Sequence, residues 1–522
     1  MKPEVTWRSY LPTVVVLAIF VVMTLSVSFL CDDAFITFRY AKHLALGHGP
    51  VYNLGEHVEG YTNFLWMLLM AVVIKLGGLP EFWSRLLSIA FSSGTLLLLL
   101  NLGRKSEGVR PARLIYPLFL ATTAPFVVWS TGGLETAATS FFTLASVLAA
   151  MSARRTGTIR HAAVAGTLAA AAILARPDAA IIAGLTAVWL LADVRQARKF
   201  VQTVAAYLAP LILLVGSHLL WRFNYYGHWL PNTFYVKSPA LEYLPFGLRY
   251  LGRFALESGL WFPLGLATIL IWKRRKLPIS NDALFLLVLF LAYSAWVVYT
   301  GGDFMTMGRF FVPILPVFYL MLSELSLSAA RIEKGALAVA AIILIAHFGY
   351  SAFMLLESRR PGSPQALDSI GLVTKYRDDW TKAAELLKRE AMPTDTIATG
   401  AAGIIPYYTD LYTVDLLGLT SPDLSGYRRR DLGRRPGHSL SIKPEQFLKL
   451  QPQFFLGTPT VETEDSAHFT WGSLEDSKEG ILEKYYPVSM PLNQDPRALY
   501  FFLRKDLAPR YQGRLTAYKI KL

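Results

Sequence analysis

A series of long apolar segments, separated by short polar and basic stretches, most strongly limits how this chain can fold. Of its 522 residues, 53% are hydrophobic and 17% are charged. About 20 apolar residues suffice to cross a hydrocarbon core of about 30 Å as a helix. The sequence therefore predicts a polytopic α-helical membrane protein rather than a soluble one. Its single cysteine, Cys31, excludes an internal disulfide framework.

The apolar segments define the expected membrane spans. They fall near residues 10–30, 63–77, 81–103, 113–130, 134–152, 161–175, 178–193, 200–222, 254–272, 282–300, 310–328 and 335–355. We interpret 10–30 as a retained first span, because it is long for a signal peptide and no small-x-small cleavage pattern precedes Asp32. Segment 63–77 would extend only about 22 Å and carries Lys75, so we expect a juxtamembrane helix there. About eleven spans remain.

The basic residues between these spans predict the orientation of the chain. With segment 63–77 outside the membrane, all the clusters fall on one side, which the positive-inside rule makes cytoplasmic. They are Arg104/Lys105/Arg110/Arg113, Arg154/Arg155/Arg160, Arg195/Arg198/Lys199, Lys273–Lys276 and Arg331/Lys334. The N-terminus is then cytoplasmic and the C-terminus extracytoplasmic, in the plasma membrane. The net charge of +14 thus reflects membrane topology and does not favour nucleic-acid binding.

The loops predicted to lie outside carry unusual polar motifs. They are residues 31–62, 130–135, 175–178, 224–237 and 301–309. Glycine and proline in these loops are explained by helix termination. Helix termination does not explain the carboxylates and arginines at the same helix ends, nor the adjacent Asp32 and Asp33, because ionisable groups near lipid are costly. We therefore expect a functional site on the outer face.

The composition changes after residue 355. We divide the chain into a membrane domain, 1–355, and an extracytoplasmic α/β domain, 356–522. An amphipathic helix is predicted over 378–391, and strands near 396–400, 412–417, 453–457 and 500–504. The run 400–408 follows a strand but lacks the spacing of a dinucleotide fingerprint, so we interpret it as a packing turn.

Several function classes lack support in the sequence. The chain has no GxSxG, HExxH, paired CxxC or P-loop pattern. Outside the cytoplasm, a sugar on a polyprenyl phosphate is the usual activated donor. A transporter or flippase of lipid-linked sugars is the rival hypothesis, but internal symmetry is not evident and the polar motifs lie at one face rather than at mid-span. A scaffold protein would leave the outer Asp and Arg residues without a purpose.

The motifs resemble those of GT-C membrane glycosyltransferases, most closely the branch containing the terminal arabinofuranosyltransferase of actinobacterial cell walls. The most specific stretch is 32–63, with DDAFI at its start and GHGPVYNLGEHVEGYTN at its end. Other similar runs are GGLET at 132–136, RPD at 176–178, HWLPNTFYVK at 228–237, GGDFMTMGRFFVPILP at 301–316 and GAAGIIPYYTDLYTVDLLGL at 400–419. The resemblance implies a GT-C fold, a polyprenyl-phosphate sugar donor, and catalytic carboxylates at Asp32 and Asp33.

The chemistry of glycosyl transfer agrees with this resemblance. A carboxylate must take the proton of the acceptor hydroxyl, and a neighbouring carboxylate raises its pKa. The sequence does not separate Asp32 from Asp33 for this role. A lipid-phosphate leaving group needs positive charge, for which Arg309, Arg176, Arg39 and Lys237 are candidates. Candidates for binding sugar or acceptor are Glu59, Tyr61, Asn63, Glu135, Asp178, His228, Asn232 and Asp303.

Other features leave alternatives open. Asp32, Asp33, Glu56 and Glu59 could together hold a divalent metal ion. Trp66, Trp129 and Trp229 could form a sugar platform or an interfacial belt. The sugar could be arabinofuranose or another pentose or hexose, and the acceptor a glycan or another hydroxyl compound. The C-terminal domain could bind the acceptor glycan or order the outer loops.

Overall fold

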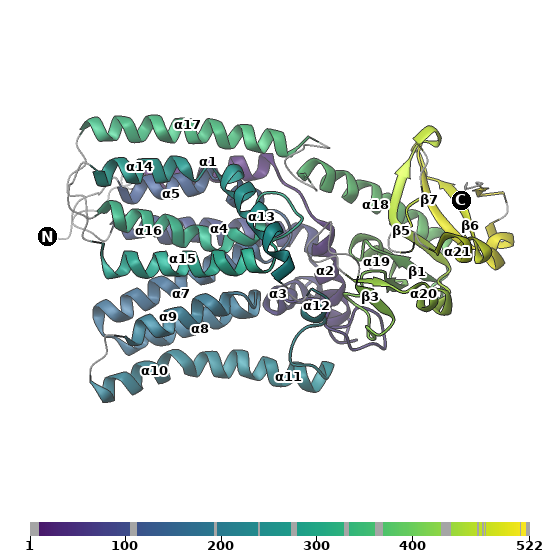
Figure 1. Ribbon diagram of the computed structural model, residues 1–522, viewed down its shortest axis with the longest axis horizontal. Coiled ribbons are helices and arrows are strands. Elements are labelled where there is room, and N and C mark those ends of the chain that lie inside the picture. Colours follow the sequence, from purple (N-terminus) through teal and green to yellow (C-terminus); the bar gives the residue numbers. More distant parts are fainter. Residues whose placement is uncertain are drawn as a thin grey trace.

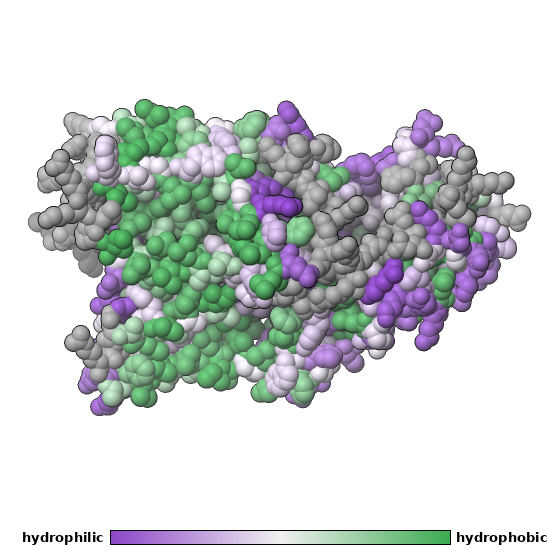
Figure 2. All heavy atoms as spheres, viewed as in Figure 1, coloured by the Kyte–Doolittle hydropathy of each residue, from purple (hydrophilic) through white to green (hydrophobic). Residues whose placement is uncertain are grey.

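The computed structural model is an elongated molecule with a helical bundle at one end and a smaller α/β region at the other (Figure 1). Green, hydrophobic surface dominates the visible face of the bundle, whereas purple, hydrophilic surface is concentrated on the α/β region (Figure 2). This distribution is what a bilayer around the bundle requires. The structure describes residues 10–104, 112–192, 196–237, 241–272, 279–327, 334–360, 369–429, 440–466, 469–471, 474, 477–511 and 513–517.

The bundle consists of long and short apolar helices. The long ones are α4 (Pro80–Arg104), α7 (Thr136–Thr156), α15 (Asn281–Tyr299), α17 (Lys334–Ser358), α16 (Leu315–Leu327) together with the 3₁₀ helix Arg309–Ile314 that leads into it, and α10 (Ala197–Leu211), which continues through a π-helical turn (Ile212–Gly216) into α11 (Ser217–Tyr226). The others are α1 (Leu11–Ser26), α5 (Ala112–Thr122), α6 (Ala124–Val128), α8 (Ile159–Ala175), α9 (Ala179–Leu191), α13 (Leu244–Ser258) and α14 (Trp261–Trp272).

The described residues contain several helices that could cross a membrane, but they do not establish the eleven spans expected from the sequence. Six helices are long and apolar enough to cross a membrane, or seven if the pair α13–α14, which bends by 75°, is one span. Four shorter apolar helices, including α1, α8 and α9, add to these. The chain is thus a multi-pass membrane protein, and the count of eleven spans stays a prediction.

The turns that carry the polar motifs gather at one end of the bundle. The chain after α1, the turns α6–α7 and α8–α9, and the loop after α11 all face the α/β region (Figure 1). The turn α7–α8 and the start of α10, with Arg155, Arg160, Arg198 and Lys199, lie at the opposite end. Of the other basic residues, Lys105, Arg110, Arg195, Lys273–Lys276 and Arg331 lie outside the described residues.

A layer of short helices separates the bundle from the α/β region. It contains α2 (Asp32–Ala45), α3 (Phe64–Lys75) and α12 (Asn232–Val236) (Figure 1). The α3 helix occupies the segment 63–77, where a juxtamembrane helix was expected, and it buries Trp66, which donates through Nε1 to the Gly133 carbonyl at 3.0 Å. This layer therefore joins the motif 31–63 to the helix ends of the bundle.

The α/β region is built on a mixed sheet of order β2-β1-β5-β7-β6-β8. The strands are β1 (Thr396–Thr399), β2 (Tyr412–Asp415), β5 (Phe454–Glu462), β6 (Tyr485–Pro491), β7 (Ala498–Arg504) and β8 (Thr516–Ala517), with a hairpin of β3 (Tyr427–Arg429) and β4 (Leu440–Ile442). Strand β1 pairs in parallel with β2 and β5, and the remaining pairs are antiparallel. The helices are α18 (Ile370–Glu390), α19 (Ile404–Thr409), α20 (Pro444–Leu450) and α21 (Lys478–Lys484).

The four strands expected from the sequence are present, with different lengths. Strand β5 extends to Glu462 because β7 pairs with its second half as well as its first. Helix α18 begins before the expected residue 378, since the Ser369 side chain caps it by accepting from the Leu372 amide at 3.2 Å. A boundary at residue 355 would fall inside α17, and the division into two domains there stays a proposal.

Candidate active site

The first turn of α2 presents the two adjacent carboxylates to different neighbours. Asp32 and Asp33 begin the helix, where the helix dipole favours negative charge. Successive residues of a helix point about 100° apart. As a result, Asp32 faces the α/β region, where it accepts from the Ile404 amide at 2.7 Å, and Asp33 faces Arg309 of the bundle. The structure thus separates two residues that the sequence treats alike.

Arg309 lies between Asp33 and a second carboxylate. Its Nη1 is 3.6 Å from Oδ2 of Asp33, and its Nε is 2.7 Å from Oδ2 of Asp303. The guanidinium also stacks over the Trp129 ring, at 5.4 Å from the centroid. The side chain of Arg309 is only 8% exposed, whereas that of Asp33 is 34% exposed. Arg309 and Asp303 therefore form a buried ion pair, and Asp33, on the other side of Arg309, is the carboxylate that solvent can reach.

A second buried arginine extends this cluster. Arg176 forms a two-pronged ion pair with Asp178, with contacts of 2.6 and 3.1 Å, and its Nη1 is 3.4 Å from Glu135. Arg176 and Arg309 both lie over the Phe310 ring, at 4.8 and 5.1 Å from its centroid. Two guanidinium groups from distant segments thus contact the same aromatic ring.

Hydrogen bonds connect the second arginine back to α2. The Asn63 amide donates to Glu135 at 2.8 Å and to the Thr37 hydroxyl of α2 at 3.1 Å. Tyr293 of α15 donates to Asp178 at 3.0 Å. Five of the predicted site residues therefore form one buried group with Asp33. They are Arg309, Asp303, Arg176, Asp178 and Glu135, with Asn63 as the link to α2.

A cavity of about 180 Å³ opens beside this group. It combines carboxylates and a lysine with an aromatic wall. Its lining residues are Asp178, Phe234, Lys237, Trp296, Val297, Thr300, Gly302, Asp303, Phe304 and Phe310. Lys237, which follows α12, lines this cavity together with Asp178 and Asp303, and its expected role at the donor phosphate stays a prediction. The cavity offers room for part of a ligand that carries both charge and apolar surface.

Another set of predicted residues lies in a separate contact region. Glu59 forms a buried ion pair with Arg222 of α11, at 2.6 Å, and Tyr61 contacts the Tyr226 hydroxyl at 3.3 Å. Asn232 donates to the carbonyls of Gly418, Leu419 and Ser421 in the α/β region. His228 is exposed and contacts only the Tyr235 ring among the interactions of the described residues. These side chains join loops to one another, and they are not grouped with Asp33.

All the hydrogen-bond donors of Arg39 are occupied by contacts that join the loop after α2 to the α/β region. Its five N–H groups have acceptors on both sides of the α2 layer. These are the carbonyls of Tyr52, Pro406 and Leu411, the Asn53 side chain and the Thr413 hydroxyl, at 2.6–3.5 Å. Because the side chain is 1% exposed and saturated, the phosphate-binding role expected for Arg39 does not fit the structure.

Burial raises the pKa of two carboxyl groups in this layer. The pKa of Asp32 rises to about 7, chiefly through burial, although the Ile404 amide opposes the rise and Asp33 adds to it only as a smaller cause. Burial likewise raises the pKa of Glu59 to about 7 against the opposing charge of Arg222. The charge of Asp33 thus contributes to the raised pKa of Asp32, but desolvation is the larger cause.

The carboxylates suggested for a divalent ion do not come together. Asp32 accepts backbone amides, Asp33 faces Arg309, Glu59 pairs with Arg222, and Glu56 accepts from Asn53 at 3.0 Å. Within the described part of the chain, no three His, Cys, Asp or Glu residues are grouped as metal ligands. The residues present therefore do not fit the metal site suggested by the sequence.

Sequence reasoning missed residues that lack a motif of their own. Tyr293 lies within an apolar segment, and Phe310 lies in the run 301–316 but was not singled out there; only the fold brings Phe310 to Arg176 and Tyr293 to Asp178. The signal for Tyr293 was a hydroxyl in an apolar helix, which needs a partner when buried. Two of the three candidate platform tryptophans are buried. Trp129 donates to the Thr306 carbonyl at 3.2 Å, and only Trp229 is half exposed.

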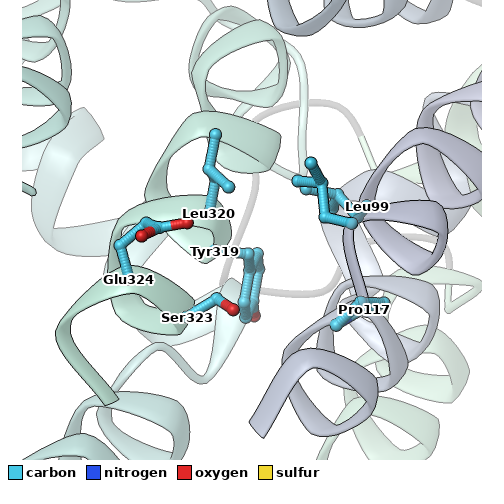
Figure 3. A pocket seen from close by; sticks show the side chains of 7 residues that line it. Leu99, Pro117, Tyr319, Leu320, Ser323 and Glu324 are labelled. Atoms are coloured by element: carbon cyan, nitrogen blue, oxygen red, sulfur yellow. The ribbon is translucent and has the colours of Figure 1, made fainter. Parts of the chain in front are cut away.

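A much smaller cavity, of about 10 Å³, lies between α4, α5 and α16. Leu320 and Glu324 of α16 lie opposite Leu99 and Pro117 there (Figure 3). This volume holds about one water molecule. The larger cavity beside Arg309 is therefore the better candidate for binding a substrate.

Comparison of the whole structure identifies its fold. The structure of ArnT from Cupriavidus metallidurans bound to undecaprenyl phosphate superimposes with a TM-score of 0.58 at 14% identity, covering 95% of this chain and 98% of that one. The chain has the GT-C fold. An oligosaccharyltransferase structure from Archaeoglobus fulgidus, tethered with an acceptor peptide, shares this GT-C fold with a TM-score of 0.52 at 11% identity, over 96% of this chain and 74% of that one.

Curated relatives confirm the resemblance to one branch of GT-C enzymes. A terminal β-(1→2)-arabinofuranosyltransferase of Corynebacterium glutamicum is 30% identical over 60% of this chain and 50% of its own length. Its namesake from Mycobacterium tuberculosis is 29% identical over 48% of this chain and 42% of its own. The chain thus spans about half the length of the curated relatives it matches. A domain of unknown function, DUF8728, matches residues 366–500.

Proposed function

We propose that this GT-C protein is a membrane glycosyltransferase that moves a sugar from a polyprenyl-phosphate donor to a hydroxyl of a glycan acceptor on the outer face of the plasma membrane. The arrangement Asp33–Arg309–Asp303 beside the large cavity carries this proposal. The names of the two curated relatives and the lipid phosphate named with ArnT support it. The N-terminus would then be cytoplasmic and the C-terminal region extracytoplasmic.

Asp33 is the better of the two aspartates for the general base. Both oxygens of Asp32 accept backbone amides of the α/β region, whereas Asp33 is partly exposed. As the bond from the anomeric carbon to the acceptor oxygen forms, Asp33 takes the hydroxyl proton. The bond from the anomeric carbon to the phosphate oxygen breaks, and the electron pair leaves with the polyprenyl phosphate.

Arg309 would stabilise the negative charge of the departing phosphate. A buried guanidinium is an effective partner for phosphate because its planar donors fit two oxygens. Asp303 fixes its orientation through Nε and leaves Nη1 facing Asp33. Arg176 and Lys237 add positive charge next to the cavity, and the cavity's aromatic wall suits the first isoprenoid units. Arabinofuranose is the first sugar to test, because both curated relatives are named for it.

The proposal is tested by transfer from a panel of polyprenyl-phosphate sugars, arabinofuranose included, to glycan acceptors by the purified protein. We expect transfer from one donor and a loss of about 10²–10⁴-fold in kcat for Asp33→Asn, because a general base supplies about that factor. Asp378→Asn, at an exposed carboxylate of α18, is the matched control and should leave the rate unchanged. Binding without transfer, combined with movement of the lipid across liposomes, would instead establish a carrier.

A further inference from the structure

The α/β region contacts the candidate active site through Asp32 itself. Oδ2 of Asp32 accepts the Gly403 amide at 3.1 Å, and Oδ1 accepts the Ile404 amide at 2.7 Å. Asp33 is the next residue in the same helical turn. Asp32, whose side chain binds the α/β region, is thus the immediate neighbour in the chain of Asp33, whose side chain faces Arg309.

The contact leaves no room for a side chain at Gly403. A Cβ atom there would lie 1.9 Å from the backbone oxygen of Asp32 and 2.7 Å from its Cγ. The φ angle of Gly403 is −100°, which other residues adopt readily. The close approach to Asp32 is therefore enough by itself to require glycine at this position.

The same segment of the α/β region holds α2 along its whole length. Arg39 donates to Pro406 and Leu411 from the middle of the helix. Near the end of the helix, Lys42 forms an ion pair with Asp410 at 2.6 Å. Phe35 packs against the rings of Tyr407 and Tyr408, with centroids 5.5 and 5.7 Å away. These contacts define a docking segment, residues 402–413, that follows α2 from its first turn to its last.

We infer that the docking segment is part of the catalytic unit and that Asp32 is a positioning residue, which holds the start of α2 so that Asp33 faces Arg309. The inference rests on the proposed function. A displacement of about 1 Å at a reacting group can cost about 10²-fold in rate. Two backbone amides on one carboxylate determine both its position and its orientation, and rotation of Asp32 would carry Asp33 with it. The α/β region therefore orders the site directly.

The test is Gly403→Ala, compared with Gly480→Ala in α21, where an added Cβ meets only an ordinary contact at 3.8 Å. We expect kcat to fall by about 10²-fold in Gly403→Ala. We expect the KM for the donor to change little, because Arg309, Arg176 and Lys237 lie on other elements. Gly480→Ala should match the wild type in both. Unchanged kcat in Gly403→Ala, or a rise in acceptor KM alone, would overturn the inference, the latter in favour of acceptor binding by the α/β region.

A second measurement separates this inference from the proposed function. Lys42→Cys and Asp410→Cys place two thiols at the ends of an ion pair, while the native Cys31 is buried. A short thiol-reactive cross-linker should join them in the resting protein and leave the transfer rate equal to that of the same protein before cross-linking. Loss of transfer on cross-linking would show that docking must be released. Absence of transfer in every protein, with efficient cross-linking, would refute the proposed reaction and not the docking.

Discussion

At the scale of single residues, the site depends on which neighbour each charged group meets. Asp32 and Asp33 are chemically identical, yet one accepts backbone amides and the other lies beside a guanidinium. Arg39 and Arg309 are both buried arginines, but Arg39 has all five donors occupied whereas Arg309 faces an exposed carboxylate. Burial alone therefore does not distinguish the two arginines; the partly exposed Asp33 beside Arg309 makes Arg309 the better candidate for binding a ligand.

Arg309→Ala is the residue-scale prediction. Removal of one donor that stabilises developing charge costs about 10²–10³-fold in kcat. We expect a loss of this size in lipid-phosphate-dependent transfer, with partial recovery in Arg309→Lys, which keeps the charge but loses the planar fork. Initial rates at saturating donor measure the effect. Arg155→Ala, in an ion pair at the other end of the bundle, is the control. Equal rates in Arg309→Ala and the control would show that Arg309 contributes to packing and not to stabilisation of the departing phosphate.

At the scale of elements, buried polar links join helices that are far apart in the sequence. The pair Glu59–Arg222 connects the loop before α3 to α11, and Asn232 connects the start of α12 to the loop after β2. Such links contribute little net stability when intact, but removal of one partner leaves an uncompensated buried charge. Their role here is to define which loop meets which helix end.

Glu59→Gln should destabilise the protein by about 3–5 kcal/mol, because Arg222 would remain buried without its counter-charge. Thermal unfolding in detergent measures this as a lowered midpoint. The double variant Glu59→Leu/Arg222→Met should recover most of the loss, since an apolar pair needs no compensation. Asp506→Asn, which removes an exposed ion pair with Arg504, should change stability by no more than about 1 kcal/mol. A midpoint for Glu59→Gln equal to that of Asp506→Asn would contradict the expectation.

At the scale of the whole molecule, the turns that carry the candidate site residues gather at the end of the bundle that faces the α/β region (Figure 1). The proposed orientation puts this end outside the cell. Two exposed positions report on it. Leu76 follows α3 near the α/β region, and Arg160 lies in the first turn of α8 at the opposite end.

Single-cysteine labelling tests the proposed topology. With Cys31 buried, Leu76→Cys should react with a membrane-impermeant maleimide added to intact cells. Arg160→Cys should react only after the membrane is made permeable, because the positive-inside rule puts its turn in the cytoplasm. The reverse labelling pattern would show that the topology is opposite to the one proposed, and it would contradict the use of a sugar donor on the outer face.

Much of the fold was predictable because it follows from periodicity and composition. Most of the apolar segments from 81–103 to 335–355, the helix expected at 63–77 and the strand positions of β1 and β2 correspond to described elements. Two expected spans are broken: 113–130 is divided between α5 and α6, and 254–272 lies across α13 and α14, which bend by 75° at the break. The expected strand near 453–457 was too short, since the length of β5 depends on β7, which lies more than 30 residues further along the chain. Local pattern predicts that an element exists, and pairing partners decide where it ends.

Hydrophobicity and charge patterning are properties of the sequence itself, and they were enough to predict a multi-pass membrane protein with polar motifs gathered at one face. Motif content was likewise enough to point to the GT-C fold. The sequence could not tell Asp32 from Asp33, recognise that Arg39 is saturated, or separate Glu59 from the group around Arg309. Only the tertiary structure decided these differences, because the surroundings of a charged side chain are set by neighbours hundreds of residues away: the amide of Ile404 for Asp32, and the guanidinium of Arg309 for Asp33.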